Sequence, residues 1–368
     1  MAETDFGALS GARKKIYSAQ IWKAGRDQNF WNSNGFVGGS TNDIIQRITE
    51  LTKTERGDKC VMQLVSDLQG DGVVGDTELT GNEEALYNDL IEIQIDQLRH
   101  GVKNKGRMSE QSTVVRFRST AQEKLSFWLA DKNDELTFLT LAGISYAFKT
   151  DGSTRVGSQL PSLAFNNQIA APSSGRKFFA GAATSTATLT TADIMSWDLI
   201  VSVHSYAKRK KIKPIRSGGR DYYAMVMSTE QFRDLRRDDD YKTIVRTAEN
   251  RGPQNPLFKG AAVVVDGIVL YDHNKVPNTF GLASSSKWGG SGTVDGAQAQ
   301  LLGAQALGLA MLGDLDLQEA DINDYGNKPG IAVGTMMGLL KPQFNSIPDS
   351  NTKQDFGTVS VYTAAAAT

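Results

Sequence analysis

Apolar side chains recur every three or four residues through the stretch 114–141, which is the spacing of one face of a helix. The apolar positions are Val114, Phe117, Ala121, Leu125, Trp128, Leu136 and Leu139, with an interruption at Lys132. Gly143 supplies a stop signal. At 1.5 Å per residue the helix would be roughly 40 Å long. The single narrow stripe predicts a helix that lies across a sheet and keeps its other side in solvent, although an ordinary long surface helix has the same pattern.

Two segments before this helix are predicted to be strands, the first because it is mainly apolar and the second because apolar and polar residues alternate along it. The first covers 60–65 and the second 90–96, and between them lies the glycine-rich, acidic run DLQGDGVVGDTELTGNEEAL. So long a loop inside a compact domain is unusual unless it has a function. We therefore predict a protruding hairpin, which His100 and Gly101 close before the long helix begins.

Residues 1–57 have little periodicity and carry scattered aromatic side chains. One short helix is predicted from residue 41 or 42 to 51, where four aliphatic residues share a face. A segment with exposed aromatics and no core of its own usually covers another surface. We interpret 1–57 as an arm.

The second half of the chain alternates strands and helices. A helix is predicted to start at Thr190 or Thr191 and to end in the basic run 208–211, where the helix dipole favours cations. Ser228 and Gln231 form a capping-box pair that opens a helix to about residue 248. The run 263–271 predicts a β-hairpin on a two-residue Asp-Gly turn. Further strands are predicted over 222–227, 300–311, 331–340 and 359–363.

Together these elements predict an α+β fold, with the helices segregated from a mainly antiparallel sheet. The length of 368 residues suggests about two domains. A net charge of -1 gives no overall attraction to nucleic acid or anionic membrane. Cys60 is the only cysteine, which suits a reducing compartment. The N-terminus lacks an apolar signal core and the apolar run 301–312 is too short to span a bilayer, so a soluble intracellular protein is expected.

The run GDGVVG at 70–75 matches the GxGxxG pattern of dinucleotide-binding loops. That function requires a helix N-terminus immediately after the glycines to hold the pyrophosphate. Here Asp71, Asp76 and Glu78 crowd the loop with negative charge instead, and EF-hand ligand spacing is also absent. A flexible loop is the favoured interpretation. An α+β enzyme with a mobile glycine-rich lid at 68–81 stays open as an alternative, because active sites assemble from distant residues.

The histidines give little support for catalysis or metal binding. His100, His204 and His273 lie far apart in sequence, with no HExxH motif and no metal-ligand spacing to Cys60. His204 falls on the apolar face of a predicted helix, where a packed histidine is expected. We predict no catalytic residues, no metal and no cofactor.

The basic run 208–220 is the best candidate for a nucleic-acid contact, and it supports a DNA-binding module as a second alternative. Aromatic residues do not interleave with it, and the acidic run 238–240 offers an opposite patch. We favour a solvated helix end, together with pairing of the two patches between neighbouring copies. The candidate pairing residues are Lys210, Lys211, Asp238 and Asp239.

Several runs along the chain carry a resemblance to a known family. They are Gly57–Lys59, Leu68–Asp76, Leu79–Glu84, Ile95–Val102, Leu302–Ala306, Asp324–Asn327, Gly338–Phe344 and Asp355–Val359. In this order they resemble the N-four-like major capsid proteins of tailed phages. The resemblance covers most of the chain and consists of structural rather than catalytic motifs.

This resemblance implies the Hong Kong 97-type capsid fold. It places an N-terminal arm at 1–57, an extended loop at 58–110, a peripheral domain with a long spine helix at 111–190 and 324–368, and an axial domain at 191–323. The implied function is that of a virion protein, not an enzyme. Its copies would assemble in the bacterial host cytoplasm into pentamers and hexamers of an icosahedral shell around double-stranded DNA.

The same resemblance sets the expected partners. They are further copies of the chain, a portal protein, a decoration protein where one exists, and DNA held by non-specific contact, with no membrane. A separate scaffolding protein is expected, because no long charged helical segment precedes the arm. The arm and the loop have too little core to stand alone, so their apolar residues are the candidate contacts to adjoining copies: Trp22, Phe30, Trp31, Val73, Val74 and Leu79.

Overall fold

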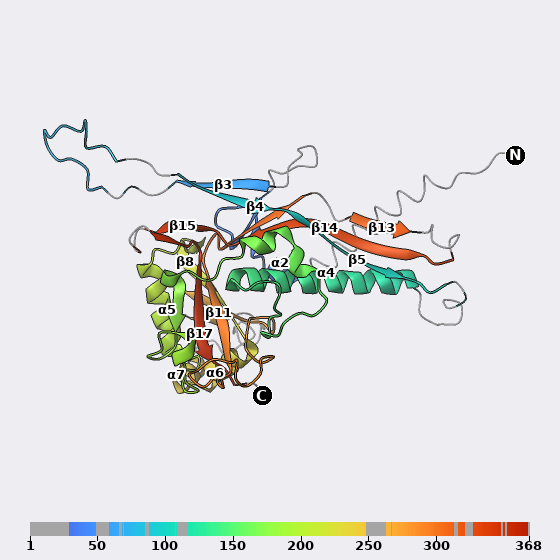
Figure 1. Ribbon diagram of the computed structural model, residues 1–368. Coiled ribbons are helices and arrows are strands. Elements are labelled where there is room, and N and C mark those ends of the chain that lie inside the picture. The colour runs from blue at the N-terminus through green and yellow to red at the C-terminus, as the bar shows by residue number, and fades with distance from the viewer. Residues whose placement is uncertain are drawn as a thin grey trace.

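The long helix α4 (Phe117–Ala142) lies at the centre of the computed structural model (Figure 1). The structure describes residues 29–48, 59–65, 68, 70–84, 88–106, 108, 117–247, 263–265, 267–312, 316–320, 327–346, 349 and 352–366. The predicted long helix is confirmed within these ranges, and residues 114–116 lie outside them. Gly143 follows the helix with φ of +70°. A Cβ there would lie 2.4 Å from the carbonyl oxygen of Ala170, so the helix end requires glycine.

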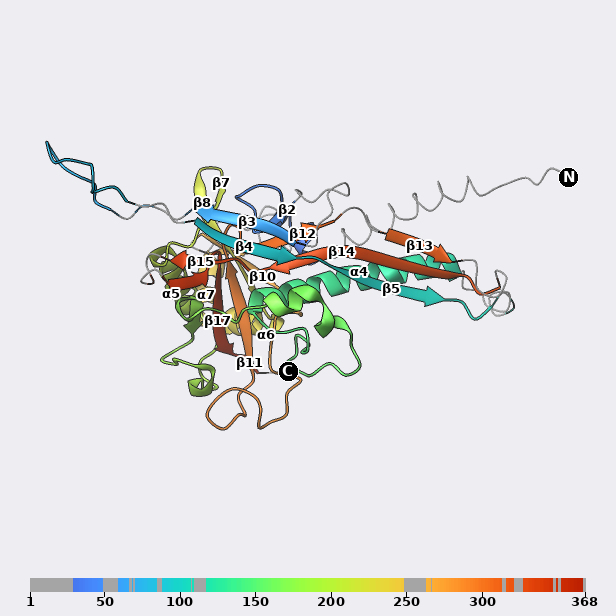
Figure 2. The same cartoon turned by 45° about the horizontal axis from the view of Figure 1, so that its top comes forward.

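A six-stranded sheet covers one side of α4 (Figures 1 and 2). Its strands follow the order β1-β2-β12-β14-β13, and β5 also pairs with β14. Strand β14 therefore hydrogen-bonds to three partners and organises the sheet. The strands are β1 (Val37–Gly38), β2 (Ile45–Ile48), β5 (Asp96–Lys103), β12 (Leu307–Met311), β13 (Asp316–Ala320) and β14 (Gly330–Leu340).

Two predictions in this region are wrong. Residues 45–48 of the predicted short helix form strand β2, which pairs in parallel with β12. Ile45 and Ile48 are both buried, and the pairing with a distant strand outweighs the local helical spacing. His100 and Gly101 do not close the hairpin, because they lie within β5, opposite residues of β14.

A seven-stranded sheet forms the second layer, in the order β6-β17-β11-β8-β10-β9, with β7 paired to β8. The predicted hairpin over 263–271 is confirmed: Ile268 pairs with Val265, and Gly267 between them has φ of +81°. The strands predicted over 222–227 and 359–363 are also present. The seven strands are β6 (Lys177–Phe179), β7 (Ile215–Ser217), β8 (Arg220–Met227), β9 (Val263–Val265), β10 (Ile268–Asp272), β11 (Gly296–Leu302) and β17 (Thr358–Ala364).

The single strand predicted over 300–311 is wrong, because the chain crosses from one sheet to the other at this point. Its first part belongs to β11 and its second part is β12. Gln305, in the crossing, has φ of +56°. Both parts are apolar, so the local pattern does not reveal the change of layer. The sheets consequently do not divide at 323/324, since β12 lies in the six-stranded sheet and β17 in the seven-stranded one.

Three helices pack against the seven-stranded sheet through a shared apolar core. They are α5 (Trp197–Arg209), α6 (Thr229–Arg237) and α7 (Asp239–Thr247). The capping box of Ser228 and Gln231 is confirmed at the start of α6. Two predicted boundaries are wrong. The cap of α5 is Ser196, not Thr190 or Thr191, and the helix after Ser228 breaks at Asp238, whose backbone is extended.

The two halves of α4 lie in different surroundings. In the first half, Ala121, Leu125 and Leu129 pack on Ile331 and Val333 of β14, as the narrow stripe predicts. Every residue in 134–142 is buried, so the expected solvent-facing side is wrong for the second half. That half lies between the two sheets (Figure 1), where its apolar side chains share one core with residues of both layers. Helices and mainly antiparallel sheets together confirm the α+β class.

A buried ionic cluster links distant parts of the chain to a small sheet of β15 (Gln343–Ser346) and β16 (Thr352–Asp355). Lys341 pairs with Asp355 at 3.1 Å, and these side chains are 2% and 1% exposed. Arg176 donates to Asp349 at 2.7 Å, and Lys210 at the end of α5 pairs with the same carboxylate. Hydrogen bonds from Lys210 and Arg176 outweigh burial and lower the pKa of Asp349.

Replacing Lys341 by methionine is expected to lower the free energy of unfolding by about 3 kcal/mol, because it leaves Asp355 as a buried charge without its cation. Lys353→Met on the same small sheet, at an exposed position, is the matched control and should change it by less than about 0.5 kcal/mol. Denaturant unfolding of the unassembled subunit measures both values. Equal effects of the two changes would contradict this role of the pair.

Asp134 on α4 holds the start of the short helix α2 (Phe30–Ser33). Both of its carboxylate oxygens accept a hydrogen bond from the backbone N–H of Phe30, at 3.1 Å. Burial raises the pKa of Asp134 to about 6, although the Phe30 N–H and Lys275 act in the opposite direction. Next to it, the His273 ring lies 4.6 Å from that of Phe30, and burial lowers the pKa of His273 to about 4.

Asp134→Asn is expected to change how stability depends on pH. The folded-state pKa of about 6 lies above the ordinary value of 3.8, so this carboxyl group stabilises the fold most at low pH and loses that contribution as the pH rises through 6. The free energy of unfolding of the variant minus that of the wild type should therefore rise by on the order of 2 kcal/mol between pH 4 and pH 7. His273 titrates in both proteins and cancels from the difference. A constant difference in denaturant unfolding would refute the expectation.

Candidate assembly surfaces

The β3–β4 hairpin projects from the body of the molecule (Figures 1 and 2). Strand β3 (Lys59–Val65) pairs antiparallel with β4 (Asn88–Gln94), and Lys59 forms an ion pair with Glu92 at 3.1 Å. Both strands agree with the predictions over 60–65 and 90–96. Beyond the paired strands the described residues 68 and 70–84 make up the tip of the hairpin, which points away from the two sheets.

The root of the hairpin is fixed to the six-stranded sheet. Ile93 of β4 is fully buried in a small core with Ile48, Ala310 and Leu340. The side chain of Gln168 accepts from the backbone N–H of Gln94 at 3.0 Å and donates to the carbonyl oxygen of Glu92 at 2.8 Å. The hairpin therefore leaves the body in a defined direction.

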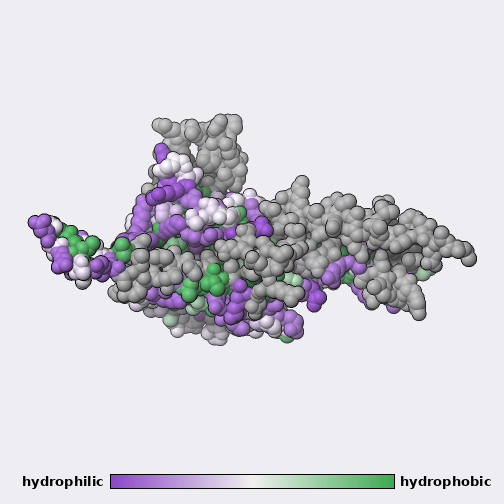
Figure 3. Space-filling view, turned by 90° about the horizontal axis from the view of Figure 1, so that it is seen from above, coloured by the Kyte–Doolittle hydropathy of each residue, from purple (hydrophilic) through white to green (hydrophobic). Residues whose placement is uncertain are grey.

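The tip carries exposed apolar side chains. Leu68, Val74 and Leu79 are 62%, 84% and 58% exposed, and Val73 is half-buried. Figure 3 shows apolar residues at this projecting end. Exposed aliphatic side chains on a protruding element are typical of a surface that another molecule covers. The predicted contact residues Val73, Val74 and Leu79 thus lie where a neighbouring copy could reach them.

The tip also carries its own hydrogen bonds and a strong negative charge. The backbone N–H of Gly70 donates to the Glu84 carboxylate at 2.7 Å, and the Thr77 hydroxyl donates to the carbonyl oxygen of Val74 at 2.8 Å. The run 68–84 contains five acidic residues and no lysine or arginine. Among the described residues of the tip no helix follows the GxGxxG run, so the arrangement needed to bind a pyrophosphate is missing.

Two of the predicted contact residues pack against the core of their own subunit, which corrects the expectation for Trp31, while Phe30 is half-buried. Trp31 is 1% exposed, and Phe30 packs against the same core. Their rings contact Phe36 and Phe138 at centroid distances between 4.7 and 5.8 Å. Sequence alone gave no sign of this, because Phe138 is more than a hundred positions away. Trp22 lies outside the described residues.

The basic and acidic runs are partly engaged within the subunit. Lys210 pairs with Asp349, and Asp238 accepts from the backbone N–H of Trp197 at 2.6 Å, at the start of α5. Lys211 is exposed. Asp239 forms an exposed ion pair with Lys242 at 2.8 Å. The structure therefore separates the four predicted pairing residues, two with structural roles and two at the surface.

Each of the three histidines packs against an aromatic ring. His204 is buried next to Tyr223 with ring centroids 5.8 Å apart, and His100 stacks on Trp128 at 4.5 Å. In the part of the chain that the structure describes, no group of three His, Cys, Asp or Glu side chains could hold a metal ion. Within the same ranges, no helix is both long and apolar enough to cross a bilayer.

Comparison with known proteins identifies the family. The family model described as phage capsid protein matches residues 6–367. The chain belongs to this family. It is 42% identical to the major capsid protein of Pseudomonas phage KPP25, over 98% of each chain.

Solved capsid structures share the fold. The capsid of Ralstonia phage GP4 is 30% identical with a TM-score of 0.77, covering 93% of this chain and 92% of the other. The capsid of cyanophage Pam1 has a TM-score of 0.71 at 20% identity, covering 90% and 92%. The predicted Hong Kong 97-type fold is therefore confirmed.

The prediction that this phage capsid protein is a structural subunit and not an enzyme is likewise confirmed. The alternatives of a lid-bearing enzyme and of a DNA-binding module receive no support.

Gly338 provides a test of the hairpin root. A Cβ at this position of β14 would lie 2.2 Å from the carbonyl oxygen of Gln94 and 2.9 Å from the Ile93 side chain. Gly338→Ala is therefore expected to separate the root of the hairpin from the sheet and to lower the free energy of unfolding by about 1–3 kcal/mol. Faster amide hydrogen exchange in β4 should accompany the loss.

Gly330→Ala on the same strand is the matched control, because its Cβ would meet only the Val102 carbonyl oxygen at an ordinary 3.6 Å. It should leave hydrogen exchange in β4 unchanged. If both variants behaved alike, the close approach at Gly338 would not be what positions the hairpin.

Proposed function

We propose that the chain is the repeating subunit of pentamers and hexamers in an icosahedral shell that encloses double-stranded phage DNA. Membership in the phage capsid protein family supports this proposal. The observation that carries it is the hairpin, because its root is held firmly while its tip exposes Val74 and Leu79. An adjoining copy would cover these side chains.

Contacts of this kind suit a closed shell energetically. Burying apolar surface contributes about 25 cal/mol per Å², so one tip adds only modestly to stability. A closed shell repeats the contact at every subunit, and stability then becomes a property of the assembly. The net charge of -1 allows copies to approach without strong mutual repulsion.

We further propose the domain assignment that the family implies, with residues 1–57 as the arm, 58–110 as the extended loop, 111–190 and 324–368 as the peripheral domain, and 191–323 as the axial domain. The sheets support two changes to these bounds. Strand β5 pairs with β14 and would belong with the peripheral sheet. Strand β17 pairs with β11 and would belong with the axial sheet.

The partners of the shell are proposed on the same basis. A scaffolding protein and a portal protein would direct assembly in the host cytoplasm, and a decoration protein would bind the outer surface where one exists. Packaged DNA would touch the inner surface without sequence-specific contacts. The near-neutral charge is consistent with weak, local DNA contacts rather than a strong general attraction.

Deleting residues 69–80 is expected to leave a folded subunit that does not form closed shells, because the deletion removes the tip but leaves the paired strands and the root. Circular dichroism measures folding, and electron microscopy of the variant and of the wild type, each expressed together with the phage's scaffolding protein, measures assembly. The double variant Val74→Asp/Leu79→Asp should give the same result without shortening the chain.

Val156→Asp is the matched control, since Val156 is 96% exposed in a different loop. This variant should assemble normally. Normal shells from the deletion variant, or loss of its folded structure, would count against the proposed function of the tip.

A further inference from the structure

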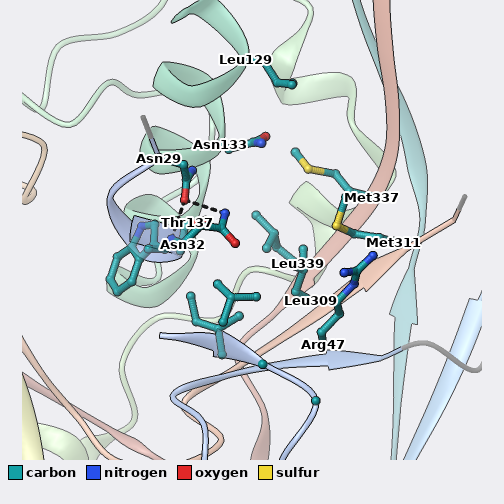
Figure 4. A pocket seen from close by; sticks show the side chains of 15 residues that line it. Asn29, Asn32, Arg47, Leu129, Asn133, Thr137, Leu309, Met311, Met337 and Leu339 are labelled. Carbon is teal, nitrogen blue, oxygen red and sulfur yellow. Dashed lines mark hydrogen bonds between the residues drawn. The ribbon is translucent and has the colours of Figure 1, made fainter. Parts of the chain in front are cut away.

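A pocket of about 190 Å³ opens between α2, α4 and the strands β2, β12 and β14 (Figure 4). The strand register places three of its lining residues in a row across the sheet, because Arg47 of β2 pairs with Leu309 of β12 and Leu309 pairs with Leu339 of β14. Met311 and Met337 form a second pair beside them in the same lining. The sheet side of the pocket is therefore an apolar surface with the cation of Arg47 at its edge.

The helices α2 and α4 form the other side of the pocket. From α4 come Leu129, Asn133 and Thr137, which follow one another at every fourth position and therefore lie on one face of the helix. Trp31 of α2 also lines the pocket and is 1% exposed. In Figure 4 the Asn133 side chain approaches the space from α4, and the Arg47 side chain approaches it from β2. The pocket is thus a slot between a helix and a sheet.

Three buried polar atoms in this lining have no hydrogen-bond partner among the described residues. They are the indole Nε1 of Trp31, the Nε of Arg47 and the Oδ1 of Asn133. Buried polar groups are nearly always paired in folded proteins, because an unpaired one loses its hydrogen bond to water without replacement. The slot therefore combines apolar walls with a few polar groups that lack partners, which is the composition of a small-molecule site.

Arg47 determines the charge of the ligand that fits. A guanidinium group stays protonated in proteins and pairs best with a carboxylate, whose two oxygens match its N–H groups. No Asp or Glu side chain lies within ion-pair distance of Arg47 in the part of the chain that the structure describes. The described residues that line the pocket include no other charged side chain. An anionic ligand would give Arg47 the partner that these residues do not supply.

The apolar row determines the rest of the ligand. Neighbouring strands lie about 4.8 Å apart, so the step from Arg47 across Leu309 to Leu339 spans roughly 10 Å, which a carboxylate with about six carbon atoms would cover. A cavity of about 150 Å³ holds benzene, and the larger volume of this pocket accommodates such a chain. A water molecule both donates and accepts, so it suits the remaining donor of Trp31 and acceptor of Asn133.

We propose that this slot binds a short aliphatic carboxylate. The carboxylate head pairs with Arg47, and the chain lies between α4 and the apolar surface of Leu309 and Leu339. A bound chain fills the space between α4 and the strands β12 and β14, so it stabilises the folded subunit by binding to it and not to the unfolded chain. This ligand site goes beyond the proposed shell function, and the shell function does not depend on it.

Titration of the full-length, unassembled chain with sodium hexanoate at constant ionic strength, followed by NMR of the ligand signals, tests the site. Saturable binding of one hexanoate per chain is expected. Acetate has the charge without the chain and hexan-1-ol has the chain without the charge, so each should bind at least about tenfold more weakly. Amide hydrogen exchange over 307–311 and 129–137 should slow when hexanoate is bound, whereas exchange in α5 should not change.

Arg47→Met removes the cation and should weaken hexanoate binding at least about tenfold. Arg216→Met is the matched control, because the Arg216 side chain is 79% exposed and lies outside the pocket lining, and it should leave the affinity unchanged. The absence of saturable binding, equal binding of acetate or hexan-1-ol, or full binding by Arg47→Met would each overturn the inference. The comparison of the three ligands uses the unaltered chain, so it decides the inference even if a variant does not fold.

Discussion

The packing of α4 against β14 is the contact on which the rest of the subunit depends. Strand β14 hydrogen-bonds to β5, β12 and β13, so the position of the helix on it sets the position of the whole six-stranded sheet. The second half of α4 then lies between that sheet and the seven-stranded one. One helix thereby holds two layers together, and its burial changes from one face to all faces where the second layer begins.

A separate cluster of buried ion pairs joins segments from distant parts of the chain. The ion pairs of Lys341 with Asp355 and of Lys210 and Arg176 with Asp349 join the end of α5 to the small sheet of β15 and β16. Charges so deeply buried add little net stability over an apolar alternative, but they do not tolerate the loss of a partner. They favour one arrangement of these segments, which is a useful property in a subunit that must present the same surfaces in every copy.

The hairpin tip differs from this rigid body in its surface. Its apolar side chains are exposed, its charge is uniformly negative, and its root is fixed by Ile93 and by the close approach at Gly338. An exposed tip on a fixed root is suited to contacts between copies that close into rings.

The sequence by itself determined the elements whose signals are local. The long helix with its glycine stop, the Asp-Gly hairpin, the capping box of Ser228 and Gln231, and the two strands of the projecting hairpin all follow from spacing or from backbone chemistry within a few residues. The resemblance in ordered motifs identified the family and therefore the fold.

Only the tertiary structure decided the features that depend on distant partners. Ile45 and Ile48 form a strand because β12 lies beside them. Trp31 is buried and Phe30 is half-buried because the second half of α4 packs against them. The change of layer between β11 and β12 likewise depends on distant strands, since β11 pairs with β17 and β12 pairs with β14. Periodicity reports how a segment relates to its own neighbours, and it cannot report which remote surface will cover it.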